Sequence, residues 1–147
     1  MGLRRLATMF HGCLLSAGLL LAGPALAQSD GASGITIDLN KLESREAACR
    51  AYLVLENGTG QDFTAFTLDL YVFGPDGVIS KRLAVNTVPL TPGKIRVRPV
   101  DIKETPCDQV SRILLNDVLD CADASGQRND CVNDVTLSTH SDAEFVK

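Results

Sequence analysis

The spacing of the cysteines says more about the chemistry of this chain than any other residue type does. Cys49, Cys107, Cys121 and Cys131 lie in the main part of the chain, and Cys13 lies near its start. Zinc-binding thiolates come in closely spaced C-x-x-C pairs, which this sequence lacks. Disulfides are therefore favoured, and four cysteines allow three pairings. We favour Cys121–Cys131, which closes a short polar loop, and Cys49–Cys107, which ties distant strands.

Carboxylates gather around that polar loop and could bind calcium, which prefers oxygen ligands. The candidates are Asp117, Asp120, Asp123 and Asp130, with Asn129 and Asp134 close by. Gly126 is not preceded by acidic residues at alternate positions, so the spacing is not that of an EF-hand. We favour the alternative of a solvated loop closed by a disulfide, and we expect neither a metal ion nor a cofactor.

Basic residues form a second group. They are Lys81, Arg82, Lys94, Arg96 and Arg98. On one sheet face they could dock an acidic partner or anionic lipid headgroups. Alternatively, they keep sheet edges from pairing with other chains, which is a general need of sheet proteins and the interpretation we favour.

Residues suited to catalysis are scarce. Past residue 27 the sole histidine is His140, in a polar stretch where we expect a solvated side chain on a fraying tail. A Ser-His-Asp triad needs its histidine on a rigid element. Asp117 and Asp120 could serve a loop-based hydrolase, but the sequence indicates no substrate cleft. We therefore expect that the protein is not an enzyme.

The first 27 residues have the three parts of a cleavable signal peptide. Arg4 and Arg5 are followed by an apolar run over residues 13–22, a Gly-Pro break and a small-x-small site ending at Ala27. The run is about half of the ~20 residues that a membrane span needs, so no span is expected after cleavage. We expect export to the periplasm or the medium, by the general secretory route rather than the twin-arginine route that Arg4-Arg5 also suggests.

Charge excludes one class of partner. Residues 1–27 hold two basic and no acidic residues, so cleavage leaves 12 of the 14 basic residues against all 18 acidic ones, a formal net charge of −6. Nucleic acid is an unsuitable partner for such a chain. We divide the remainder into a flexible linker over residues 28–34, one domain over residues 35–140 and a flexible C-terminal tail over residues 141–147.

Short alternating segments predict about seven strands. They begin near residues 35, 49, 66, 78, 94, 110 and 131. Residues 41–48 are expected to form at most a turn of helix, residues 57–60 a hairpin turn and residues 116–130 a loop, while Pro99 should interrupt the fifth strand. Little helix and no βαβ rhythm favour an all-β, immunoglobulin-like antiparallel sandwich held by disulfides.

Two resemblances follow from longer motifs. Residues 66–73 (FTLDLYVF), the Asp76-Gly77 turn and residues 90–94 (LTPGK) resemble exported bacterial immunoglobulin-like domains of the FxLYD kind. With residues 45–57, residues 112–118 and the last two cysteines, the chain also resembles small exported alphaproteobacterial proteins, labelled by their signal sequence. The resemblance implies a sandwich fold and export, and it implies no activity.

We infer three functional hypotheses from these features. The leading one is a non-enzymatic binding or interaction module of the cell envelope, whose partner is another envelope protein; this is an analogy at the level of the fold. The second is an envelope hydrolase or inhibitor that works through its loops. The third is a structural subunit of an envelope assembly, which calcium could stabilise.

Overall fold

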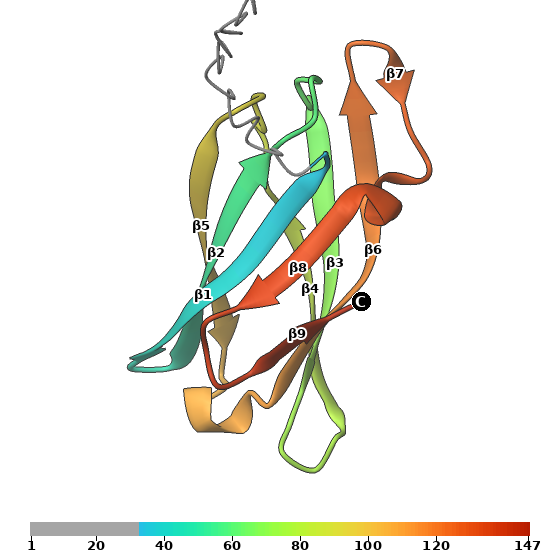
Figure 1. Ribbon diagram of the computed structural model, residues 1–147. Helices are drawn as coiled ribbons and strands as arrows, with labels where there is room; N and C mark the ends of the chain where they lie inside the picture. Colours follow the sequence, from blue (N-terminus) through green and yellow to red (C-terminus); the bar gives the residue numbers. More distant parts are fainter. Residues whose placement is uncertain (1–32) are drawn as a thin grey trace, which may run out of the picture.

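The computed structural model describes residues 33–147, so the predicted signal peptide and most of the linker lie outside the described residues. These residues form nine strands and two short 3-10 helices (Figure 1). The strands are β1 (Ile35–Arg45), β2 (Ala48–Asn57), β3 (Ala65–Phe73), β4 (Ile79–Asn86), β5 (Ile95–Lys103), β6 (Arg112–Asp123), β7 (Gly126–Gln127), β8 (Val135–Thr139) and β9 (Glu144–Val146). The helices are η1 (Cys107–Gln109) and η2 (Cys131–Asp134).

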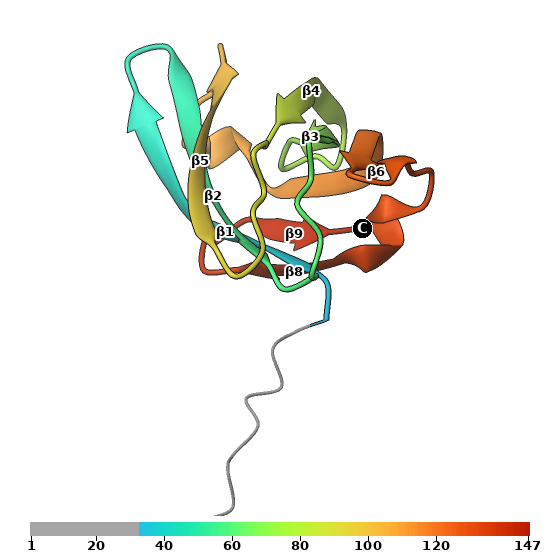
Figure 2. The same ribbon diagram turned by 90° about the horizontal axis from the view of Figure 1, so that it is seen from above.

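Two sheets pack face to face around one core. The first has the strand order β5-β2-β1-β8, and the second has the order β4-β3-β6-β7, with β9 paired to β6. Figure 2 shows β5 and β2 on one side of the molecule and β3, β4 and β6 on the other. Alternation explains the core, because every second residue of a strand points to the same face. Both sheets contribute buried side chains, among them Ile37, Leu53, Phe66, Leu70 and Ile113.

The prediction of an all-β, disulfide-bonded sandwich is confirmed, but the sheets are mixed rather than antiparallel. β1 pairs in parallel with β8, and β6 pairs in parallel with β9. The prediction of a hairpin turn at residues 57–60 is wrong, because the chain crosses there from β2 in the first sheet to β3 in the second. Tertiary packing, rather than local turn signals, decides which strands become neighbours.

Residues 41–48 contain no helical turn, which corrects the sequence prediction. β1 continues to Arg45 and turns directly into β2, with Leu42 opposite Ala51 and Ser44 opposite Cys49. A register shift at Asn40 reverses the alternation between the two halves of β1. Ladder hydrogen bonds to β2 thus override the helix-forming residue types.

β5 runs through Pro99, which was expected to interrupt it. Pro99 lies opposite Tyr52 in a ladder that continues without a register shift from Ile95 to Lys103. β5 has β2 as its sole sheet neighbour in the described part of the chain. An edge strand tolerates a proline whose nitrogen faces away from the sheet.

The loop predicted over residues 116–130 is partly strand. β6 extends to Asp123, and β7 pairs with its end. Two register shifts against β3 leave Asn116 and Leu119 without an opposite residue. These bulges break the alternation, which is why the sequence pattern ended the strand too early. The strand predicted from residue 131 begins at Val135, after the short helix η2.

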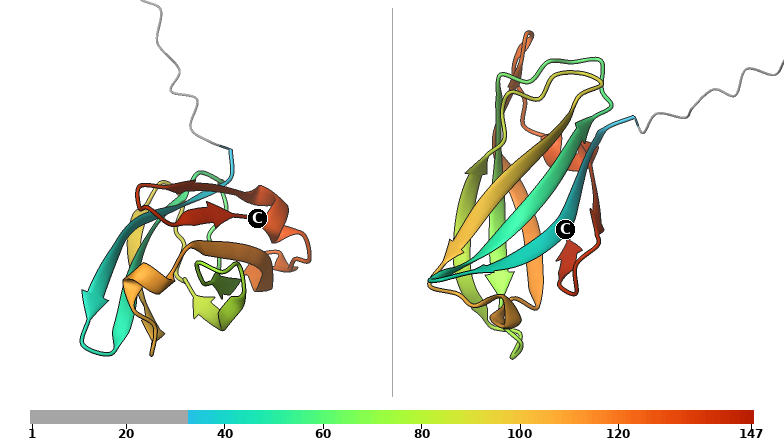
Figure 3. Two further views of the ribbon diagram at one scale, coloured as in Figure 1. Left: turned by 90° about the horizontal axis from the view of Figure 1, so that it is seen from below. Right: turned by 90° about the vertical axis from the view of Figure 1, so that its left-hand side faces the viewer.

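The C-terminal residues do not form the flexible tail that was predicted. β9 pairs with β6, Phe145 is buried, and Lys147 Nζ donates hydrogen bonds to the carbonyls of Val132 and Val135. The left panel of Figure 3 shows β9 beside β6. The domain therefore extends past residue 140, because the apolar Phe145 completes the core.

Both predicted disulfides are present. Cys49–Cys107 joins the start of β2 to η1, and Cys121–Cys131 joins the end of β6 to η2. Cys49, Cys121 and Cys131 are buried in the core, and Cys107 packs against it, so both bridges are part of the core packing.

Candidate interaction surface on strand β5

The face that each β5 side chain occupies is fixed by the buried end of the strand. Ile102 is fully buried opposite Cys49, so it faces the core. Residues at even positions share that face, which puts Arg96 and Arg98 on the inner side, opposite Leu55 and Leu53. Because β5 is an edge strand, these two arginines lie at the open margin of the sandwich and are exposed.

The same parity turns apolar side chains outward. Ile95 and Val97 are 66% and 59% exposed on the outer face of the first sheet. Their opposite residues on β2 are Glu56 and Val54. The alternation of this segment alone would favour the reverse arrangement, with isoleucine and valine inside. Burial of Ile102 at the far end of the strand decides the parity instead.

Arg96 and Arg98 differ from the other arginines of the described domain in their salt bridges. Residues 33–147 contain seven arginines, and five of them form a salt bridge with a carboxylate. The pairs are Arg45–Glu43 at 3.1 Å, Arg50–Asp101 at 2.6 Å, Arg82–Asp69 at 2.7 Å, Arg112–Glu144 at 2.6 Å and Arg128–Asp134 at 2.7 Å. Within residues 33–147, Arg96 hydrogen-bonds only to the Pro89 carbonyl, at 3.2 Å, and Arg98 has no side-chain hydrogen bond.

The other members of the predicted basic row lie elsewhere or are already paired. Lys81 and Arg82 belong to β4, the edge strand of the second sheet, which contacts β5 on the same side of the sandwich. The right panel of Figure 3 shows β5 running obliquely to the strands of the second sheet. Lys81 forms a salt bridge with Glu104 at 3.1 Å. Lys94 precedes β5 and forms no side-chain hydrogen bond within the described residues.

Arg82 is committed to a cluster on the outer face of the second sheet. Its Nε donates to Asp69, whose side chain is 2% exposed, and its guanidinium lies 5.5 Å from the centre of the Tyr71 ring. Asn116 Nδ2 donates to the other carboxylate oxygen of Asp69 at 2.9 Å. The Arg82 hydrogen bond, with help from Asn116 and against the effect of burial, holds the pKa of Asp69 below its ordinary value. The predicted row therefore reduces to Lys94, Arg96 and Arg98.

The acidic residues proposed for calcium are dispersed. Asp117 accepts a hydrogen bond from the Val118 amide, and Asp123 accepts one from the Ser125 amide. Arg128 bridges Asp130 and Asp134. In the described part of the chain, no three His, Cys, Asp or Glu side chains converge as metal ligands would. Asp120 lies on β6 opposite Thr67.

His140 takes part in a polar cluster that the sequence did not indicate. Its Nδ1 lies 2.9 Å from Oδ2 of Asp38, a residue 102 positions away on β1, although its side chain is 72% exposed. Ser138 donates to Asp38 at 2.7 Å and Asn40 donates at 3.1 Å. Burial raises the pKa of Asp38, but these three contacts outweigh it and hold the pKa below its ordinary value. His140 is thus tied to β1 rather than fraying.

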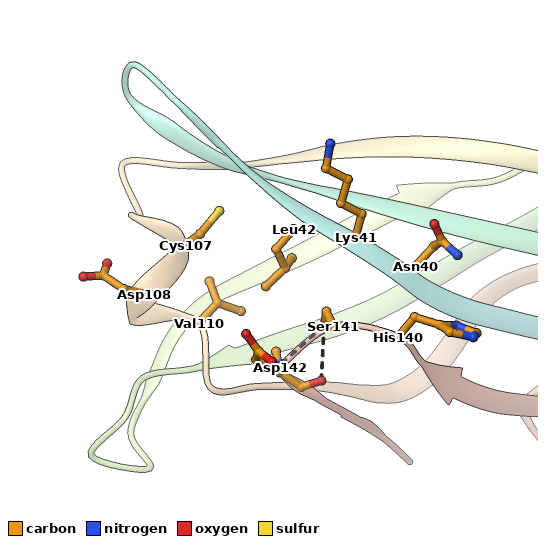
Figure 4. Close-up of a pocket in the computed structure, with 10 residues that line it drawn as sticks. Asn40, Lys41, Leu42, Cys107, Asp108, Val110, His140, Ser141 and Asp142 are labelled. Carbon is orange, nitrogen blue, oxygen red and sulfur yellow. Dashed lines mark hydrogen bonds between the residues drawn. The ribbon is translucent and has the colours of Figure 1, made fainter.

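A cavity of about 480 Å³ adjoins this cluster. β1, η1 and the β8–β9 connection line it, with Lys41, Asp108 and Asp142 among the lining residues. Figure 4 shows the imidazole of His140 directed away from Ser141 and Asp142. Among residues 33–147, no hydroxyl group hydrogen-bonds to its second ring nitrogen. The arrangement is a carboxylate-oriented imidazole without a nucleophile, so it gives no catalytic assignment.

The fold and the β5 surface define a disulfide-bonded β-sandwich with a cationic edge that no carboxylate of residues 33–147 neutralises. No family model, curated protein or solved structure matches the chain. None of the helices among residues 33–147 has the length and apolarity to span a membrane.

Proposed function

We propose that this protein is an exported, non-enzymatic binding module of the cell envelope, which docks an acidic partner protein on β5. One observation carries the proposal: Arg96 and Arg98 are the two described arginines without a carboxylate partner, and they lie on one face of an edge strand.

Guanidinium chemistry explains why this pair suits a protein carboxylate. An arginine presents a planar fork of donors that matches a carboxylate bidentately, as Arg50 does with Asp101 through two hydrogen bonds. Ile95 and Val97 add exposed apolar area beside the charges. Arginine is enriched in protein interfaces, and the centre of an interface is more apolar than the rest of the surface.

An anionic membrane is a poorer match for the same surface. Each basic residue near such a membrane contributes about 1 kcal/mol of attraction, and three of them make a weak anchor. After cleavage at Ala27 the chain as a whole would carry a formal charge of −6, which an anionic surface repels. An acidic protein segment needs only the local charge of Lys94, Arg96 and Arg98.

Export and immunoglobulin-like character are part of the proposal. The two disulfides support an oxidising compartment, since such bonds persist in secreted and periplasmic proteins. The signal-peptide pattern predicts that the mature chain begins at Gln28. Sequencing the N-terminus of the protein from the periplasmic or extracellular fraction tests this, and an intact Met1 in the cytoplasm would contradict it.

The binding test reverses the charge of two residues in the first half of β5 and, as a control, of two residues at the far end of the same sheet. The variant Arg96→Glu/Arg98→Glu is compared with Arg45→Glu/Lys103→Glu, which changes the net charge equally at the far end of the same sheet. Each tagged protein is recovered from its own cells, and the bound proteins are quantified. We expect Arg96→Glu/Arg98→Glu to lose its partner and Arg45→Glu/Lys103→Glu to keep it.

Edge protection is the competing explanation and makes the opposite prediction. If these arginines merely protect the edge, Arg96→Glu/Arg98→Glu retains every partner that the unaltered protein binds. The sole effect of the substitutions is then self-association of the variant at high concentration. That result would remove the proposed function.

A further inference from the structure

The backbone of β5 presents free hydrogen-bonding groups beside the two arginines. The Asn57 amide donates to the Lys94 carbonyl at 3.5 Å, one position beyond the last pair of the ladder, Glu56–Ile95, so the bonds toward β2 fall at Lys94 and at every second residue after it. Pair types alternate along antiparallel strands, so Arg96 turns its backbone groups toward β2, whereas Ile95 and Val97 turn theirs away. No segment of residues 33–147 other than β2 forms a backbone hydrogen bond with β5.

The first half of β5 is a regular open edge of the described domain. β8, the opposite edge of the same sheet, also pairs without a register shift but is five residues long. Register shifts interrupt β4 at Ser80 and β6 at Asn116 and Leu119, and such bulges discourage pairing with an added strand. β5 pairs with β2 without a shift. Pro99, which has no N–H, ends the row of outward donors after Val97 and confines an added strand to the first half of β5.

We propose that the acidic partner docks as an extended strand added to β5 at residues 95–98, with acidic side chains at alternate positions opposite Arg96 and Arg98 and apolar side chains between them. This inference rests on the proposed function and specifies its partner. An added strand continues the two faces of its neighbour, so carboxylates meet the arginines on one face and apolar groups meet Ile95 and Val97 on the other.

A second copy of this chain is a poor occupant of the same edge. Antiparallel pairing of two β5 strands about Val97 puts Arg96 of one copy opposite Arg98 of the other. Like charges directly opposite each other destabilise a strand pair. The edge therefore favours a different sequence, with carboxylates at alternate positions.

The test uses short synthetic peptides that alternate glutamate with valine, and matched peptides in which lysine replaces glutamate. Binding to the full mature protein is followed by NMR titration, and amide hydrogen exchange is measured with and without peptide. We expect the glutamate peptide alone to bind, and the amides of Ile95 and Val97 to exchange at least about tenfold more slowly in the complex.

Backbone methylation distinguishes strand addition from simple charge attraction. Methylating the peptide nitrogens at one set of alternate positions should weaken binding by about tenfold or more, and methylating the other set should not. The variant Val97→Pro should weaken binding similarly, because it removes an outward N–H and leaves both arginines in place.

The outcomes separate this inference from the proposed function. If Arg96→Glu/Arg98→Glu abolishes binding but both methylated peptides and Val97→Pro bind normally, acidic docking stands and strand addition is wrong. If the lysine peptide binds equally well, both are wrong. If no peptide binds, strand addition is wrong, and the charge-reversal pull-down decides the proposed function separately. Dimerisation of the unaltered protein through β5 would also overturn the inference.

Discussion

The carboxylate of Asp69 is buried on an outer sheet face and accepts a hydrogen bond from Nε of Arg82 at 2.7 Å. This pair neutralises Arg82 within the fold, whereas Arg96 and Arg98 have no carboxylate partner among residues 33–147.

Replacing Asp69 by Asn should destabilise the domain by about 1.5–3 kcal/mol, the usual value of a hydrogen bond to a charged group. The free energy of unfolding in urea measures the loss. Glu144→Gln is the matched control, because the Glu144–Arg112 pair is exposed at both ends and should contribute less than about 1 kcal/mol. Equal losses for the two variants would contradict the role given to burial.

Acid should destabilise the domain partly through Asp38. Its pKa is lower in the folded protein than in the unfolded chain, so its stabilising contribution is present above the unfolded value of about 4 and is lost as the pH falls through the folded value. Melting temperatures between about pH 6 and pH 2 should therefore fall less steeply for Asp38→Asn than for the unaltered protein. Parallel curves would show that the contacts with Ser138, Asn40 and His140 contribute nothing.

Phe145→Ala should cost about 3 kcal/mol, because it empties a buried site in β9. The neighbouring Val146 is 38% exposed, so Val146→Ala should cost much less. Chemical unfolding of both variants measures the difference. A Phe145→Ala protein as stable as the original would mean that β9 is not part of the core.

The two disulfides should contribute unequally. Cys49–Cys107 spans 58 residues and Cys121–Cys131 spans 10, so loop-closure entropy gives about 4 and about 3 kcal/mol respectively. Paired Cys→Ala variants, unfolded in denaturant, give both values. A larger loss from removing the short loop would show that another effect dominates.

Alternation predicted the strands of the sandwich, and the short spacing of Cys121 and Cys131 predicted their disulfide, because both are local patterns. Cys49 and Cys107, 58 residues apart, were then the cysteines left to pair. Local pattern did not predict β9, whose three residues become a strand by pairing with the distant β6. It also did not predict the second half of β1, whose helix-forming residues pair with the start of β2. The sequence showed the row of basic residues. It did not show that Lys81 and Arg82 form salt bridges while Arg96 and Arg98 have no carboxylate partner among the described residues. Asp69 and Arg82 pair across two strands, and the Asp38–His140 contact joins residues 102 positions apart.

The most direct test of the central claim is site-specific photocrosslinking in the cells that produce the protein. A photoreactive residue replaces Val97 in one variant and Lys103, at the far end of the same strand, in another. We expect a crosslink from position 97 to an acidic segment of another protein, and we expect Arg96→Glu/Arg98→Glu to abolish it. A crosslink that persists after this charge reversal, or that forms equally from position 103, would contradict the assignment of β5 as the docking surface.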